Sequence, residues 1–205
     1  METTEPARKY ESPLREQQAA ETRQSILRAV LTLFERESDF DVSMPAVAKE
    51  AGVSLRTVYR HFPTKSDLMI GLTEVQNLRS DVFDATTPDE LATAVADQFR
   101  TMSENEPLFR AMNSSRAGQD ARRDARRGRQ MIIEQPMRPV SQRLEADDAR
   151  KLHALVNVLS SSAALFYMQD MWEWSTEDAA DAAGWGIAVL ADRARRTRHV
   201  GLDAD

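Results

Sequence analysis

Cysteine is missing from all 205 residues, which excludes disulfide bonds, thiolate metal sites and a cysteine nucleophile. A chain without disulfides is suited to a reducing cytoplasm. Glycine is also sparse, with seven residues, and we find no phosphate-binding glycine loop, H-E-x-x-H or G-x-S-x-G motif. The three histidines, His61, His153 and His199, lie far apart in the sequence. We therefore expect no catalytic site, no metal ion and no cofactor.

Long apolar runs are absent as well. The most apolar region, LHALVNVLSSSAALFYM from Leu152, holds a histidine, an asparagine and three serines within 17 residues, which favours a buried helix over a membrane span. The amino terminus, METTEPARKYESPLREQQAAETR, is charged where a signal peptide needs an apolar stretch. We expect no membrane association, a cytoplasmic protein and a disordered arm over residues 1–15.

Helical periodicity dominates the rest of the chain. Hydrophobic residues make up 41% of the sequence, enough for a packed core, and they recur at i, i+3, i+4 and i+7 with little period-two alternation. This pattern predicts an all-α fold of about nine helices. Two short ones follow Ser43 and Ser54, and the others are expected at about 15–37, 65–84, 88–104, 106–116, 119–145 with an interruption, 147–173 and 176–197.

Charge is distributed unevenly along the chain. The net charge is −6, yet the stretch from Ser43 to Lys65 holds Lys49, Arg56, Arg60 and Lys65 against the single acid Glu50. A local basic patch on an acidic protein favours one confined nucleic-acid contact over nonspecific coating of DNA by the whole surface.

The basic stretch has the pattern of two short helices joined by a tight turn. Ser43 and Ser54 are good N-caps, and Gly52 can adopt the left-handed conformation that the turn needs. Val58 and Phe62 are four residues apart and face inward. Thr64 and Asp67 form a capping-box pattern at the start of the next helix, which places Lys65 at its amino end.

This pattern predicts a helix-turn-helix whose second helix enters the major groove of double-stranded DNA. Arginine can form a fork to guanine, threonine can contact a thymine methyl group, and tyrosine and lysine suit phosphate oxygens. Arg56 is expected to recognise a base, with a phosphate contact or plain exposure as the alternative. The residues expected to contact DNA are Ser43, Ser54, Leu55, Arg56, Thr57, Tyr59, Arg60, His61 and Lys65.

The segment AVAKEAGVSLRTVYRHFPTKSDLM, and with it SILRAVLTLF, resembles the DNA-binding domain of the tetracycline-repressor (TetR) family of transcriptional regulators. The resemblance covers residues 22 to about 72 and implies phosphate contacts for Tyr59 and Lys65. It departs from the family at RESDF, where glycine is usual, and at Leu55 and Arg56. It implies a helix-turn-helix domain at 16–70 and a ligand-binding and dimerisation domain at 71–205, acting as a homodimer on an operator.

Large apolar side chains in the second half of the chain predict a pocket for a small, hydrophobic effector, because methionine adapts to irregular shapes. Pro136 and Pro139 predict a kinked or broken helix as one wall, or an ordinary break between helices. Each residue taken singly is also a good core residue. The candidate lining residues are Phe99, Met102, Phe109, Met112, Met131, Phe166, Met168, Met171 and Trp172.

The last two expected helices carry apolar or small residues on more than one side, which predicts a two-fold dimer interface. A single thick core is the alternative. The candidate interface residues are Leu155, Leu159, Ala163, Ala183, Trp185, Ile187 and Leu190.

The run QDARRDARRGR at 119–129 carries five arginines and two aspartates. Its four-residue repeat is typical of a solvated, ion-paired helix face. An anionic ligand group or a second nucleic-acid contact remains the alternative. The function predicted for the whole chain is that of a repressor released from an inverted-repeat operator by a small hydrophobic ligand. The alternative is a helical scaffold that binds protein through its helix-turn-helix.

Overall fold

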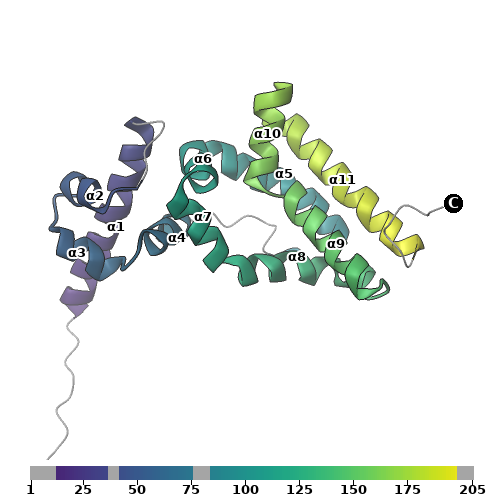
Figure 1. Ribbon diagram of the computed structural model, residues 1–205, viewed down its shortest axis with the longest axis horizontal. Coiled ribbons are helices and arrows are strands. Elements are labelled where there is room, and N and C mark those ends of the chain that lie inside the picture. Colours follow the sequence, from purple (N-terminus) through teal and green to yellow (C-terminus); the bar gives the residue numbers. More distant parts are fainter. Residues whose placement is uncertain (1–12, 37–41, 76–83, 198–205) are drawn as a thin grey trace, which may run out of the picture.

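The computed structural model describes residues 13–36, 42–75 and 84–197, and every regular element in these ranges is a helix (Figure 1). The all-α prediction is therefore confirmed, with eleven helices in the described residues against the nine expected. Residues 1–12, which make up most of the predicted arm, and His199 lie outside the described ranges. The helices are α1 (Pro13–Arg36), α2 (Met44–Glu50), α3 (Leu55–His61), α4 (Lys65–Val75), α5 (Pro88–Glu104), α6 (Glu106–Ser114), α7 (Arg116–Asp124), α8 (Arg126–Ser141), α9 (Ala146–Leu159), α10 (Ser162–Trp172) and α11 (Thr176–Arg196).

The helix expected at 147–173 is two helices, because serine side chains interrupt its backbone ladder. The Ser160 hydroxyl donates to the carbonyl oxygen of Val156 at 2.9 Å, and the Ser161 hydroxyl donates to that of Val158 at 2.7 Å. Ser161 Oγ also accepts from the amide of Ala164 at 3.2 Å and so caps α10. Serine competes with the helical backbone for hydrogen bonds in this way, and the triple serine ends one helix and starts the next.

The helix expected at 119–145 is also divided, but at Ala125 and not at the prolines. The sequence predicted a kink or a break there, and helix α8 continues through Pro136 and Pro139 to Ser141 without a break. Ile133, Met137 and Val140 of α8 are buried in the core. This burial offsets the hydrogen bonds that the two prolines remove.

Apolar side chains form two cores. The N-terminal core contains residues of α1 to α4 together with Leu108, Ala111 and Met112 of α6 and Ala117 and Ala121 of α7. The C-terminal core contains residues of α5 and α8 to α11. Helices α6 and α7 therefore follow α5 in the chain but pack with the first four helices, so the packing does not divide at residues 70 and 71.

Helices α5 and α11 lie side by side in the C-terminal core (Figure 1). A Cβ atom on Gly184 would lie 2.8 Å from the carbonyl oxygen of Ala92, so glycine permits the close approach of the two backbones. The close approach that Gly184 permits is thus to α5 of the same chain.

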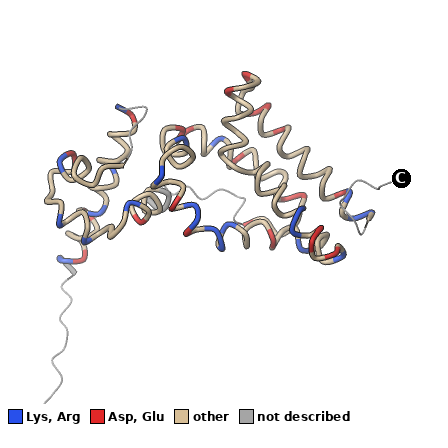
Figure 2. The backbone as a smooth tube through the Cα atoms, in the orientation of Figure 1, with Lys and Arg blue, Asp and Glu red and all other residues tan. Residues whose placement is uncertain are grey.

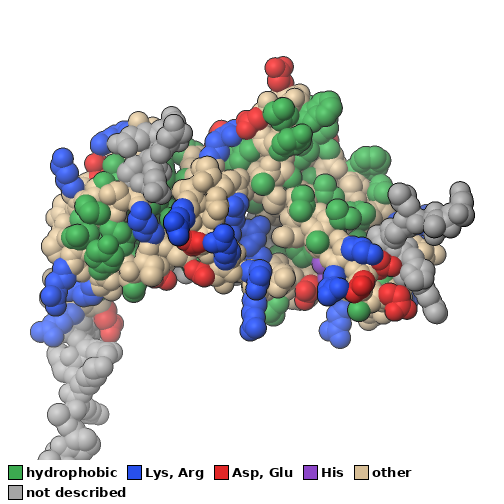
Figure 3. Space-filling model, in the orientation of Figure 1, with side chains coloured by type: hydrophobic (Ala, Val, Ile, Leu, Met, Phe, Trp, Pro, Cys, Tyr) green, Lys and Arg blue, Asp and Glu red, His purple; other side chains and the backbone are tan. Residues whose placement is uncertain are grey.

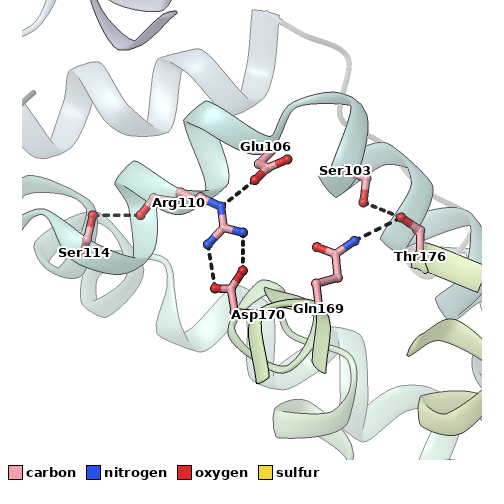
Figure 4. Close-up of polar contacts among 7 residues, drawn as sticks. All are labelled: Ser103, Glu106, Arg110, Ser114, Gln169, Asp170 and Thr176. Atoms are coloured by element: carbon pink, nitrogen blue, oxygen red, sulfur yellow. Dashed lines mark hydrogen bonds and ion pairs between the residues drawn. The ribbon is translucent and has the colours of Figure 1, made fainter. Parts of the chain in front are cut away.

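Polar contacts connect the end of the α5–α6 segment to the tip formed by α10 and α11 (Figure 4). Arg110 of α6 donates two hydrogen bonds to Asp170 of α10, at 2.8 and 2.7 Å, and a third to Glu106 at 2.6 Å. Hydrogen bonds from the Arg110 guanidinium lower the pKa of Asp170. The same guanidinium lies 4.4 Å from the centre of the Phe166 ring. Ser103 and Thr176 share a hydrogen bond of 2.8 Å. The Arg110 contacts join α6, which packs in the N-terminal core, to α10 of the C-terminal core, and the Ser103–Thr176 contact joins α5 to α11.

None of the helices within the described ranges is long and apolar enough to cross a membrane.

Candidate nucleic-acid interface

Helices α2 and α3 are short, and local hydrogen bonds determine where each begins. Ser43 Oγ accepts from the amide of Ala46 at 3.5 Å at the start of α2, and Ser54 Oγ accepts from the amide of Thr57 at 3.1 Å at the start of α3. Gly52 between them has φ of +67°, and nothing lies within 4 Å of a Cβ built there. Its backbone conformation therefore explains the glycine, as the sequence predicted.

Helix α3 has one side in the core and the other exposed. Val58, and Phe62 just after the helix, are fully buried. Leu55 and Tyr59 are 40% and 47% exposed, and Arg56 and Arg60 are also exposed. A helix that enters a DNA groove needs apolar residues on one side to anchor it in the core. It also needs exposed side chains, such as arginine and tyrosine, on the other side.

Three of the predicted DNA-contacting residues also have a structural role. Ser54 Oγ and Thr57 Oγ1 share a hydrogen bond of 2.8 Å, in addition to the capping bond from the Thr57 amide. Ser43 is half-buried at the cap of α2. These hydrogen bonds hold the backbone of the first turn of α3, which carries Arg56, in shape before any DNA binds.

Lys65 is exposed at the first position of α4. The predicted capping box is confirmed: the Thr64 amide donates to Asp67 Oδ2 at 3.0 Å, and the Asp67 amide donates to Thr64 Oγ1 at 3.0 Å. The basic side chain is thus attached to a rigid helix start beside the end of α3.

His61 is half-buried beneath the end of α3, and its Nε2 atom has no hydrogen-bond partner within the described structure. Burial lowers its pKa, and the charges of Arg60 and Arg23 lower it further. His61 is among the residues that the sequence predicts to contact DNA. The lowered pKa keeps the His61 imidazole neutral at neutral pH.

Arg23 of α1 was not among the candidates, yet it lies at the base of this surface. Its guanidinium is 4.4 Å from the centre of the Phe62 ring. A Cβ on Gly71 of α4 would lie 2.7 Å from the same ring, so α4 can pass Phe62 only with glycine there. No local motif marks Arg23 or Gly71, because their partner Phe62 is distant in the sequence.

An ion pair neutralises the one acidic side chain between Ser43 and Lys65. Glu50, the one acid between Ser43 and Lys65, pairs with Arg36 of α1 at 3.1 Å. Figure 2 shows Lys and Arg positions spread over α1 to α4. The one carboxylate between Ser43 and Lys65 is therefore compensated by an arginine of α1.

The nine candidate pocket residues occupy three different environments. Phe99, Met102 and Phe166 are buried in the C-terminal core, with Phe109 and Met168 packed against it, and Met112 lies in the N-terminal core. Met131, Met171 and Trp172 are exposed, so they do not line an interior cavity of a single chain. None of the nine lines the hollow of about 760 Å³ along α5 or the hollow of about 550 Å³ between α4 and α7.

The seven candidate dimer residues divide in the same way. Ala183 and Ile187 are fully buried against their own chain, so they cannot contact a second copy. Leu159 and Leu190 are half-buried against the C-terminal core. Leu155, Ala163 and Trp185 are exposed. The helical pattern showed which positions were apolar but not which helix covered them.

Within the described ranges, no three histidine, aspartate or glutamate side chains gather closely enough to hold a metal ion.

Comparison with known proteins agrees with this geometry. Residues 26–72 match the family model for bacterial regulatory proteins of the tetR family. Three curated relatives, HTH-type transcriptional regulators of Staphylococcus aureus strains USA300, NCTC 8325 / PS 47 and COL, are each 46% identical over 50 residues. That match covers 24% of this chain and 27% of each relative.

No solved structure matches the chain. The matched residues coincide with α2, α3, most of α4 and the second part of α1, the elements that build the basic surface. The helix-turn-helix segment of the chain, residues 26–72, is therefore similar to the DNA-binding segment of the tetR family of bacterial regulatory proteins.

Proposed function

We propose that the protein is a sequence-specific DNA-binding transcriptional regulator, a repressor that leaves an inverted-repeat operator when a small hydrophobic ligand binds. The observation that carries this proposal is α3, a helix buried through Val58 on one side and exposing Arg56, Tyr59 and Arg60 on the other. The family match supports the same function for these residues. Such a regulator acts on the bacterial chromosome, which places it in the cytoplasm.

Action as a homodimer is supported by an apolar surface on the last three helices. Large hydrophobic side chains of α9 to α11 are exposed, and Figure 3 shows hydrophobic side chains gathered over this end of the molecule. An exposed apolar surface of this kind is typical of an interaction site. Its members are Leu155, Val158, Tyr167, Met171, Trp172, Trp174, Trp185 and Val189. A two-fold dimer would place two α3 helices in major grooves roughly 34 to 36 Å apart, or a multiple of that spacing.

Control by a ligand requires a physical connection from the C-terminal core to α3. Helix α4 begins beside α3 and packs on α7, where the buried Ser66 hydroxyl donates to Asp124 Oδ2 at 2.6 Å. A ligand that displaces α6 or α7 would move α4 and with it the end of α3. Such a ligand changes DNA affinity only if its affinity for the DNA-bound arrangement of these helices differs from its affinity for the DNA-free arrangement.

The test is selection of bound sequences from a random duplex pool, repeated at low and high salt. We expect an inverted repeat whose affinity falls steeply with salt, because neutralised phosphates release counterions. Competition with small molecules then identifies compounds that release the duplex. A helical scaffold that binds protein through the same helices predicts no salt-sensitive duplex binding, and that result would refute the proposal.

A further inference from the structure

Two of the five arginines in the run 119–129 do not lie on its solvated face. Arg123, Arg126 and Arg127 are exposed, and Arg123 pairs with Asp120 at 2.7 Å, as the four-residue repeat predicted. Arg122 and Arg129 are half-buried instead. The two lie seven residues apart, on either side of the junction between α7 and α8.

Arg122 is held by neutral groups. It donates one hydrogen bond to the side-chain oxygen of Asn113 and a second to the Asn113 backbone oxygen at 3.3 Å. The hydroxyl of Ser162, from α10, donates to the same side-chain oxygen at 3.1 Å. These bonds orient the guanidinium but bring no negative charge to it, and burial lowers the pKa of Arg122.

The side chain of Arg129 has neither a hydrogen bond nor an ion pair to any described residue. Burial lowers the pKa of Arg129, and the positive charge of Arg122 lowers it further. Arginine nevertheless stays protonated at neutral pH. Partial burial of two like charges without a carboxylate is unfavourable, and an acceptor with negative charge would remove the penalty.

The position of the pair adds a second argument. Helix α7 packs in the N-terminal core through Ala117 and Ala121, whereas α8 packs in the C-terminal core through Ile133 and Met137. Figure 2 shows Lys and Arg positions along α7 and the start of α8, between the two halves of the molecule. Asn113 of α6 and Ser162 of α10 bring polar groups from both halves to the same place.

We propose that Arg122 and Arg129 bind the oxyanion group, a carboxylate or a phosphate, of the small-molecule effector. The proposal rests on the proposed function and gives its ligand a chemical class: an anionic head group on an apolar body. Guanidinium groups form planar, paired hydrogen bonds with such oxyanions. A bound oxyanion would attract α7 and α8 to one another and change the packing of α7 on α4, next to the DNA-binding surface.

The experiment uses the full chain and its Arg129→Gln variant, with Arg127→Gln as a matched control for loss of an exposed charge from the same run. Without added ligand, Arg129→Gln should melt at a higher temperature than the parent, since it removes an uncompensated charge, and Arg127→Gln should not. Sodium decanoate should raise the melting temperature of the parent and the control by at least about 2 °C. Decan-1-ol, which lacks the carboxylate, should not.

Inorganic phosphate, at matched ionic strength, forms the second arm. A shift with phosphate alone assigns a phosphorylated ligand, and a shift with decanoate alone assigns a carboxylate. Arg129→Gln should lose either shift, with affinity at least about tenfold lower by calorimetry. Equal shifts in Arg129→Gln and the parent, or no shift of the parent with either anion, would overturn the site.

Failure of this site is distinct from failure of the proposed function. A protein that selects an inverted repeat but ignores both anions retains the regulatory function and loses the oxyanion site. A protein whose melting temperature responds to anions through Arg129 but binds no duplex retains the site and refutes DNA regulation.

Discussion

Arg56 and Lys65 carry the same charge on different helices, and we expect their replacement to have different effects on DNA binding. Arg56 lies on the exposed face of α3 and Lys65 at the start of α4. Lys65→Ala should weaken all duplex sequences similarly and reduce the salt slope by about one unit, because a phosphate contact carries no sequence information. Arg56→Ala should cost about 1–3 kcal/mol at one base pair and relax the preference there.

Binding of the parent and both variants to a set of single-base operator changes measures the difference, with Arg127→Ala as a control for net charge. A uniform loss in Arg56→Ala would assign Arg56 to the phosphate backbone.

The position of His61 predicts a pH effect on stability. Its pKa is below the ordinary 6.5 because of burial, Arg60 and Arg23, so the unfolded chain takes up a proton more readily than the folded chain. The stability contributed by neutral His61 is present above the unfolded pKa and is lost as pH falls through the lower folded pKa. We expect the melting temperature to fall between about pH 7.5 and pH 5.5, and to fall less in His61→Gln.

His153→Gln serves as the comparison, because burial also lowers the pKa of His153, in the C-terminal half. Probes of the N-terminal core should respond to His61→Gln and not to His153→Gln. An unchanged pH profile in both variants would contradict the assignment.

At the scale of helices, two glycines in helix interiors predict opposite results. Gly184→Ala would place a methyl group 2.8 Å from the carbonyl oxygen of Ala92, and backbone atoms cannot move aside as a side chain does. Forced separation of α5 and α11 should lower the free energy of unfolding by about 1–3 kcal/mol. Gly128→Ala in α8 meets nothing within 4 Å and should raise stability by about 0.5–1 kcal/mol, because alanine favours helix.

Chemical denaturation of the two variants checks this pair of predictions. Gly186→Ala is an intermediate case, because its methyl group would meet only the Leu159 side chain, at 3.1 Å. A stable Gly184→Ala protein would show that α5 and α11 are not held at this separation.

At the scale of the whole molecule, the exposed apolar surface predicts a dimer that a surface substitution separates. Trp185 is 73% exposed on α11, so Trp185→Arg should give a folded monomer with unchanged helix content and greatly reduced operator affinity. Sedimentation equilibrium and circular dichroism measure both properties. Ala183→Arg is the contrasting variant: because Ala183 is fully buried, the arginine should unfold the C-terminal core instead of separating intact subunits.

A monomeric parent protein that binds its operator normally would contradict the dimer.

Local features of this protein could be predicted because the groups that form them are close in the chain. The caps at Ser43 and Ser54, the turn at Gly52 and the Thr64–Asp67 capping box join residues within a few positions of one another. The inward direction of Val58 and Phe62 follows from helical period alone. The basic surface on α3, and the family it indicates, were therefore accessible without a structure.

Only the tertiary structure decided what each apolar or charged helix face meets. The sequence shows that Ala183 and Trp185 are both apolar. Ala183 is buried and Trp185 is exposed because of how α5, which is distant in the chain, packs on α11. The same holds for Arg122 and Arg129, which the four-residue repeat does not distinguish from their exposed neighbours. Burial of a side chain and its ion pairs depend on contacts between segments that are distant in the chain. The local sequence pattern does not show which distant segment packs against a given helix face.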